Sequence, residues 1–166
     1  MQESMLLKKL TSQFGDRILE ATVIRDEATY LVDKAALVEI CEFVKNDADL
    51  QMNYLVDVLG VDYPAASRRF EVVYHLYSIP LRLRLRLKVR LKDGESVPTV
   101  TGVWPGADWP EREVYDMYGI RFDGHPNMKR IYMPPDWDGF PMRKDYPLKG
   151  YKDEYNPFGE EREEDF

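Results

Sequence analysis

The chain has 166 residues, of which 44% are hydrophobic and 32% are charged, and its net charge is −7. This length and composition suit one folded domain with a core and exclude a chain that is disordered throughout. An acidic chain is also a poor general binder of nucleic acid, because neutralising phosphates requires a basic surface.

The cysteine count and the lengths of the uncharged stretches indicate in which kind of compartment the chain lies. Cys41 is the only cysteine, so no disulfide can form within the chain, which fits a reducing compartment. The first residues have neither the apolar region of a secretory signal nor the Arg-rich character of a transit peptide. The longest uncharged stretches, residues 72–81 and 96–107, fall short of the ~18 apolar residues of a membrane helix. We therefore expect a soluble chain that reaches a membrane only through partners.

The first quarter of the chain alternates helical and strand patterns. Apolar residues recur at helical spacing in residues 3–14, which predicts a short helix. Residues 18–25 and 28–32 are rich in β-forming residues and predict a hairpin. A second helix is predicted over residues 34–46, with Asp33 as its N-cap.

Three further strands are predicted over residues 54–61, 69–78 and 81–91. In the last of these, every odd position is Leu or Val and every even position is Arg or Lys. Only a period of two places these sets on opposite faces, whereas a helix would mix them. The basic face is read first as a solvated strand face and second as a docking face for an acidic partner. A nucleic-acid stripe is the remote third reading, because aromatic residues do not interleave with the basic ones.

Specific residues mark the ends of a helix near residue 110. Asp108 is the predicted N-cap and Glu111 is its N3 partner, a spacing typical of a capping box. Glu111 and Glu113 suit the positive end of the helix dipole. Gly119 predicts where the helix ends.

The charges of this helix could also be read as acid–base carboxylates. The structural reading is stronger, because the cap accounts for Glu111 and because Arg112 and Asp116 are i,i+4 neighbours that can pair. We therefore expect no catalytic residue in this chain. The residues treated as a structural motif are Glu111, Arg112, Glu113, Asp116, Gly119 and His125.

The character of the sequence changes after Gly124. Prolines recur through residues 125–166 and preclude a long helix or an inner strand. Aromatic residues are nevertheless spread through the same stretch, and disordered tails are normally poor in them. The predicted fold class is therefore α+β: a compact domain over residues 1–124, with a mixed or antiparallel sheet and a few helices, followed by an extended, Pro- and aromatic-rich arm with an acidic tail over residues 125–166.

The arm is predicted to insert its aromatic side chains into pockets of its own domain or of a partner. Trp137, Arg143 and Tyr146 are the preferred anchors, since Trp, Tyr and Arg dominate interface hot spots. Asp145 either pairs with a basic partner or orients Arg143, and the sequence leaves both open.

Ligand residues for a cofactor are scarce. An iron–sulfur cluster needs about four cysteines and zinc needs three or four His, Cys or carboxylate ligands. The two histidines lack metal-ligand spacing: His75 lies in a predicted strand and is read as structural, and His125 is read as bonding a turn. Gly-rich nucleotide-binding motifs are absent from the sequence. We therefore expect no cofactor and no metal in this chain.

A family resemblance appears in the second half of the chain. Residues 111–126 read EREVYDMYGIRFDGHP, and they are followed by KRI at 129–131, PDWDGFP at 135–141 and RKDYPL at 143–148. These blocks resemble, in the same order, those of the C subunit of proton-translocating NADH:quinone oxidoreductase (respiratory complex I). This is the family of the mitochondrial iron–sulfur-fraction subunit that itself holds no cluster.

The resemblance implies a non-catalytic structural subunit of the hydrophilic arm of that enzyme. Its partners would be the quinone-site subunit, which it supports, and the neighbouring iron–sulfur subunits. The complex would pass electrons from NADH through FMN and iron–sulfur clusters, all held in partner subunits, to quinone, and couple this to proton translocation. The chain would then lie peripherally on the cytoplasmic side of the cell inner membrane, without direct membrane insertion and without nucleic acid.

Three alternatives remain open. The nearest is an equivalent subunit of a related membrane-bound hydrogenase or other quinone reductase. The second is a stand-alone enzyme that uses Glu111 and Asp116. The third is a nucleic-acid module that uses the basic strand face.

Overall fold

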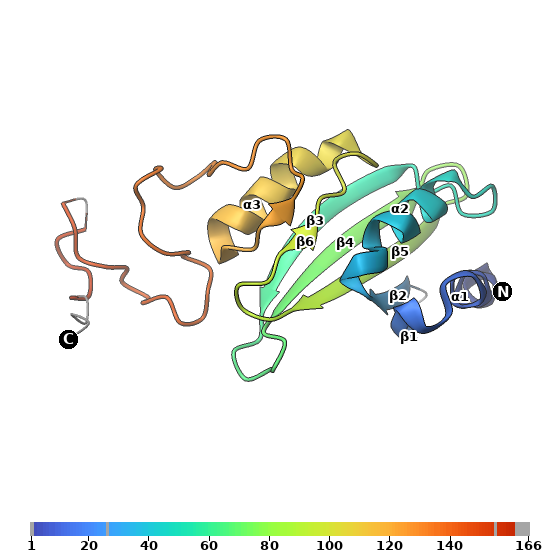
Figure 1. Cartoon of the computed structure of the whole chain (residues 1–166), viewed down its shortest axis with the longest axis horizontal. Helices are drawn as coiled ribbons and strands as arrows, with labels where there is room; N and C mark the ends of the chain where they lie inside the picture. The colour runs from blue at the N-terminus through green and yellow to red at the C-terminus, as the bar shows by residue number, and fades with distance from the viewer. Residues whose placement is uncertain (1, 26, 155, 162–166) are drawn as a thin grey trace.

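A computed structural model describes residues 2–25, 27–154 and 156–161, with side chains described from Lys8 onward. These residues form a five-stranded mixed sheet with three α-helices, which confirms the predicted α+β class (Figure 1). The chain starts beside the sheet at one end of the molecule and the arm runs to the other end. Tyr155 of the arm, the tail 162–166 and the apolar side chains of residues 5–7 lie outside the described residues.

The strand order of the sheet is β1-β2-β5-β4-β3. β1 (Ile18–Ile24) and β2 (Glu27–Val32) form the predicted antiparallel hairpin. β2 then pairs in parallel with β5 (Leu83–Leu91), and β4 (Phe70–Ser78) lies antiparallel between β5 and β3 (Tyr54–Asp62). The parallel β2–β5 pair within an otherwise antiparallel order makes the sheet mixed, as expected.

The first two helices confirm their sequence signals. α1 (Gln2–Phe14) lies beside the β1–β2 hairpin. α2 (Leu37–Asn46) follows a 3-10 turn, Lys34–Ala36, and lies across the sheet (Figure 1). The side chain of Asp33 accepts a hydrogen bond from the N–H of Ala35 at 2.8 Å, so it caps this helical segment as predicted.

The alternation in β5 is confirmed, although the strand is shorter than predicted. Its leucines and valine are buried while Arg84 and Arg90 are exposed on the other face. The predicted start at residue 81 is wrong, because Leu81 and Arg82 form a turn and Arg82 has a φ of 54°. The buried face packs in one core with the apolar side of α2, which contributes Leu37, Ile40, Cys41 and Val44.

A small second sheet positions the third helix. β6 (Val97–Pro98) pairs in parallel with β7 (Phe122–Asp123), and a 3-10 turn, Pro105–Ala107, leads into α3 (Asp108–Tyr118). α3 packs against β3 at the edge of the large sheet. The approach is close at Gly60, where a Cβ would lie 2.6 Å from the ring of Tyr118. β6 and β7 are too short for sequence patterns to reveal.

The arm leaves α3 and β7 and runs away from the sheet in turns and extended segments (Figure 1). Its isolated bridge between Tyr151 and Glu160 closes a loop near the end of the described chain. That residues 1–124 form a domain separate from residues 125–166 stays a prediction. Among the described residues, no helix combines the length and the apolar character needed to cross a membrane.

Candidate functional site at the third helix and the arm

The start of α3 differs from the prediction. Ala107 is the N-cap residue and Asp108 already belongs to the helix. The fully buried carboxylate of Glu111 accepts hydrogen bonds from the N–H of Val100 at 2.8 Å and from the hydroxyl of Thr99. The predicted capping box is therefore wrong, because Glu111 bonds a distant loop instead of the first turn of its own helix. Glu111 thus fixes the loop that follows β6 to α3.

Burial also changes the acidity of Glu111. Removal from water raises the pKa of Glu111 to about 7, although the two hydrogen bonds that its carboxylate accepts act in the opposite direction. The side chain of His125 is buried beside it, with Nε2 3.9 Å from the carboxylate. Nδ1 of His125 accepts the N–H of Asn127 at 3.0 Å, so Nε2 carries the proton that points to the carbonyl oxygen of Asp108 at 3.2 Å. The prediction that His125 bonds a turn is confirmed.

Asp116, at the other end of α3, organises the arm. Its buried carboxylate accepts hydrogen bonds from Arg130 at 2.9 Å and from three consecutive backbone N–H groups, those of Ile131, Tyr132 and Met133, at 3.0, 2.7 and 3.0 Å. Burial alone would raise the pKa of Asp116, but these donors outweigh it and hold the pKa below its usual value. A single carboxylate therefore shapes residues 130–133.

The predicted pair between Arg112 and Asp116 is wrong. Arg112 instead stacks over the ring of Trp109, 4.6 Å from its centroid, and donates to the carbonyl oxygen of Lys129 at 3.0 Å. Glu113 is exposed on the same helix. The i,i+4 spacing permitted the pair, but the arm supplies Asp116 with more donors than one arginine of the helix could.

Gly119 ends the helix, as predicted, and also seats the arm. It adopts a left-handed φ of 80°, and its N–H bonds the carbonyl oxygen of Tyr115 at 2.8 Å. A Cβ at this position would lie 2.6 Å from the ring of Phe140. Arg130 covers the same ring at 4.9 Å from its centroid. Only glycine satisfies both the backbone conformation and the contact with the arm.

The predicted anchor Arg143 and its neighbour Asp145 both contact earlier parts of the chain. Asp145 accepts hydrogen bonds from Arg69 at 2.7 Å and from Nε of Arg143 at 3.2 Å. Arg143 also bonds Asp93 at 3.1 Å, in the turn that follows β5. The reading that Asp145 orients Arg143 therefore agrees with the structure, whereas pairing of Asp145 with a basic partner stays a prediction. The bond from Arg69 is the main reason that the pKa of Asp145 lies far below its usual value.

Asp62 and Phe70 complete this attachment. Both carboxylate oxygens of Asp62 bond Arg69, at 2.7 and 2.8 Å, and one also accepts the N–H of Lys144 at 2.7 Å. The guanidinium groups of Arg69 and Arg143 each lie 5.0 Å from the centroid of the Phe70 ring. Residues 143–145 are thereby fixed at the ends of β3 and β4.

Trp137 and Tyr146 lie together on the outer part of the arm. Both line a shallow hollow of about 300 Å³ whose other walls include Tyr151 and several acidic side chains. The rings of Tyr146 and Tyr151 meet edge to face, 5.3 Å apart, and partial burial raises the pKa of Tyr146. That Trp137, Arg143, Asp145 and Tyr146 bind a partner stays a prediction.

The two carboxylates of α3 that were considered for acid–base chemistry hold other segments of the chain in place. Glu111 and Asp116 are fully buried, and donors from this chain occupy their carboxylates. Within the described part of the chain, no three His, Cys, Asp or Glu side chains are grouped to hold a metal ion. Sequence reasoning missed Asp62, Arg69 and Asp93, because nothing in the local sequence indicates pairing with residues 50 or more positions away.

These contacts define an α+β domain whose buried carboxylates hold an extended C-terminal arm. The sequence profile of one family, described as respiratory-chain NADH dehydrogenase, 30 Kd subunit, matches residues 30–152. The chain belongs to this family, which confirms the resemblance seen in residues 111–148.

Individual relatives agree. The chain is 48% identical over 161 residues to the C subunit numbered 2 of the NADH-quinone oxidoreductase of Rhizobium etli, covering 97% of this chain and 86% of that protein. It is also 48% identical over 143 residues to the C subunit of the NADH-quinone oxidoreductase of Geotalea uraniireducens, covering 86% of each. Among solved structures, it is similar to a chain of the membrane-bound sulfane sulfur reductase MBS, an archaeal respiratory membrane complex. The TM-score is 0.77 and the coverage is 89% of this chain and 87% of that one, at 23% identity, so this match shows the fold alone.

Proposed function

We propose that this chain is a non-catalytic structural subunit, the C subunit, of the hydrophilic arm of an NADH:quinone oxidoreductase. Membership of the 30 Kd subunit family and the names of relatives that align along most of the chain support this assignment. The buried carboxylates of α3, which accept hydrogen bonds from other parts of the chain, fit a protein that organises contacts.

The proposal includes a role within the complex. The chain supports the quinone-site subunit and contacts neighbouring iron–sulfur subunits, while electrons pass from NADH through FMN and iron–sulfur clusters of those partners to quinone, coupled to proton translocation. It is held at the cytoplasmic side of the cell inner membrane through the complex. We expect the isolated chain to be colourless, because one cysteine and two histidines cannot ligate a cluster. Stoichiometric flavin or iron in the purified chain would contradict this expectation.

The observation that carries the proposal is the outward side of the arm. While its polar residues bond their own domain, four large apolar side chains point outward. Leu148 and Phe158 are 104% and 87% exposed, and Tyr132 and Met142 are exposed as well. Large exposed apolar patches mark interaction surfaces. We propose that these four side chains contact a partner, while the polar contacts of the arm hold it to the rest of the chain.

Assembly in the native membrane tests the proposal. Deleting residues 125–166 should abolish or strongly weaken both assembly of the complex and NADH:quinone activity, whereas deleting residues 160–166 should matter less, because solvated charges contribute little. Leu148→Asp with Phe158→Asp should impair assembly without lowering the melting temperature of the free chain, because neither side chain is buried. Normal assembly of the chain truncated after residue 124 would refute the docking role of the arm.

The control for the double variant is Leu19→Asp, which places a charge on another exposed apolar residue, in β1. Alanine variants of Trp137, Arg143 and Tyr146 test the anchors predicted from sequence. Their effect on assembly is interpretable only beside the melting temperature of each free chain, because these side chains also have contacts within the arm and its domain.

A second candidate function is the equivalent role in a related membrane-bound hydrogenase or other quinone reductase. The match to a chain of the archaeal MBS complex shows that this fold also occurs in a respiratory membrane complex with another printed activity, which is why the candidate is kept. Purifying the native complex and identifying its companion chains separates the two, since a flavin-bearing NADH-oxidising partner is required by the first candidate only.

A further inference from the structure

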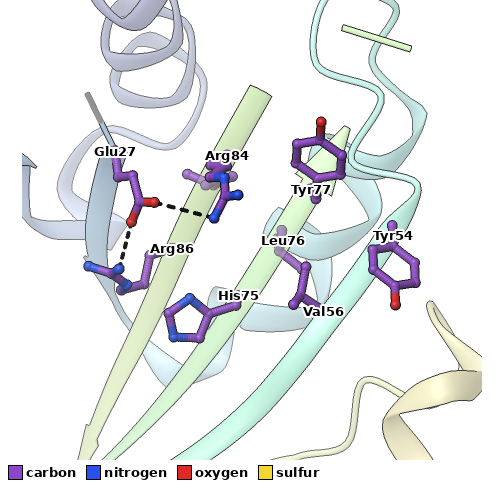
Figure 2. A pocket seen from close by; sticks show the side chains of 9 residues that line it. Glu27, Tyr54, Val56, His75, Leu76, Tyr77, Arg84 and Arg86 are labelled. Atoms are coloured by element: carbon purple, nitrogen blue, oxygen red, sulfur yellow. Dashed lines mark hydrogen bonds and ion pairs between the residues drawn. The ribbon is translucent and has the colours of Figure 1, made fainter. Parts of the chain in front are cut away.

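The face of the sheet turned away from the core carries a hollow of about 250 Å³. Residues from four neighbouring strands line it: Glu27 of β2, Arg84 and Arg86 of β5, His75 and Tyr77 of β4, and Tyr54 and Val56 of β3 (Figure 2). Successive strand residues point to opposite faces, so this surface is the reverse of the one that packs on α2.

One wall of the hollow is basic. The carboxylate of Glu27 lies between two guanidinium groups, 2.8 Å from Arg86 and 3.6 Å from Arg84 (Figure 2). One negative charge therefore faces two positive charges, and the side chain of Arg84 is 70% exposed. Burial, and then Arg86, lowers the pKa of His75, so its imidazole adds hydrogen-bonding atoms but no charge at neutral pH. In a chain of net charge −7 this wall keeps a surplus positive charge.

The opposite wall is apolar and open. Tyr54 and Val56 lie on the edge strand β3 and are half exposed, and Tyr77 lies beside them, with Arg84 over its ring at 5.8 Å from the centroid. Aromatic residues and arginine are the residue types enriched in protein interfaces. The hollow is smaller than the ~300–1,000 Å³ of pockets for drug-sized ligands. It suits an inserted side chain better than a cofactor.

We propose that this hollow is a second docking site, separate from the arm, for an extended segment of another subunit of the same complex. The segment carries an apolar side chain adjacent to an Asp or Glu. The apolar side chain packs between Tyr54 and Tyr77, and the carboxylate bonds Arg84, whose counter-ion Glu27 is shared with Arg86. This inference rests on the proposed function, because the partner is a subunit of that complex.

Thiol labelling tests whether the hollow is covered. Cys41 is buried and is the only native cysteine, so a cysteine introduced at position 56 would be the accessible thiol of the chain. The rate at which a maleimide modifies Val56→Cys is measured in the free full chain and in the purified complex. We expect the rate to fall about tenfold or more in the complex, because the centre of an interface excludes water.

Two reference variants measure the general slowing of labelling in a large complex. Leu19→Cys matches the site in exposure, at 56% against 52% for Val56, and Ser67→Cys lies in the exposed loop between β3 and β4. For each variant, the labelling rate in the complex is divided by the rate in the free chain. The proposal requires this ratio to be lower for Val56→Cys than for the reference variant with the higher ratio.

Charge reversal tests the carboxylate contact. Arg84→Glu should weaken retention of the chain in the complex during a salt wash about tenfold, because truncating or reversing a buried charge contact raises the dissociation rate. Arg84→Lys should restore most of the retention. Arg25→Glu, an exposed arginine in the turn that follows β1, is the matched control and should behave as the unmodified chain. The melting temperature of free Arg84→Glu should be nearly unchanged.

The outcomes separate this inference from the proposed function. If the chain assembles but Val56→Cys reacts as fast as in the free chain, the docking site is refuted and the proposed function stands. If the chain joins no respiratory complex, both are refuted. If labelling of Val56→Cys in the free chain slows as the protein concentration rises, the hollow is covered by a second copy of this chain. If the slow labelling disappears when residues 160–166 are deleted, the hollow is covered by the acidic tail. Either result overturns the proposed occupant.

Discussion

Removing the carboxylate of Asp116 should release the start of the arm. Asp116→Ala leaves four donors without their acceptor: Arg130 and the backbone N–H groups of residues 131–133. Breaking a buried ion pair by deleting one partner costs about 3–5 kcal/mol, and the partial exposure of Arg130 places the expected loss near ~3 kcal/mol. Asp116→Asn keeps one acceptor oxygen but loses the charge, and should cost about 1–2 kcal/mol.

Hydrogen exchange measures this loss where it occurs. A loss of ~3 kcal/mol corresponds to about a hundredfold increase in the opening equilibrium, so the amides of residues 131–133 should exchange about a hundredfold faster in Asp116→Ala. Amides of β4 report on the domain itself and should change less. Glu113→Ala, which removes an exposed acid from the same helix, is the control. Unchanged exchange at residues 131–133 in Asp116→Ala would refute the organising role of Asp116.

Three further predictions follow from burial, charge and backbone conformation. Leu85→Asp should destabilise by ~3 kcal/mol or more in urea denaturation, because the carboxylate would be buried without a partner, whereas alanine at exposed Arg84 should change stability by less than ~0.5 kcal/mol; equal losses would contradict the assignment of the two faces. The folded-state pKa of Glu111, about 7, exceeds its unfolded value of 4.5, so its contribution to stability should fall as pH rises from 4.5 to 7 and then level off. Glu111→Gln should remove this part of the pH dependence, up to about 3 kcal/mol of unfolding free energy. If the unfolding free energies of the two proteins change in parallel with pH, the raised pKa is refuted. Gly119→Ala should destabilise by ~1 kcal/mol or more beyond Gly94→Ala, because both glycines have φ near 80° but only the first Cβ would clash with a ring of the arm; equal losses would show that the contact is unimportant.

The features that the sequence predicted correctly are those encoded locally. The alternation of residues 83–91, the hairpin of residues 18–32 and the cap at Asp33 each depend on residues within a few positions of one another. Period, turn chemistry and capping act at that range, and the chain adopts them without a competing partner. The left-handed Gly119 belongs to the same group, because the C-terminal end of a helix favours glycine whatever surrounds it.

The errors in the candidate site share a different cause. Spacing along α3 allowed Glu111 to cap its own helix and Asp116 to pair with Arg112, and both local partners lost to distant ones. Glu111 bonds the N–H of a residue 11 positions earlier, and Asp116 bonds residues 14 to 17 positions later. A buried carboxylate must satisfy several acceptor sites at once, and only folded backbone provides enough donors. Hydrogen bonds from residues distant in the sequence cannot be predicted from spacing along a helix.

Attachment of the arm to its own chain is compatible with the docking role that we propose. Arg143 and Asp145 form hydrogen bonds with Asp93 and Arg69 of the same chain, so an arm that docks would reach its partner already shaped. Preorganisation of this kind lowers the entropy cost of binding. Variants of these hydrogen-bonded residues should therefore weaken assembly by loosening the arm, with a measurable loss of stability in the free chain. Variants of outward Leu148 should weaken assembly while the free chain remains as stable as before.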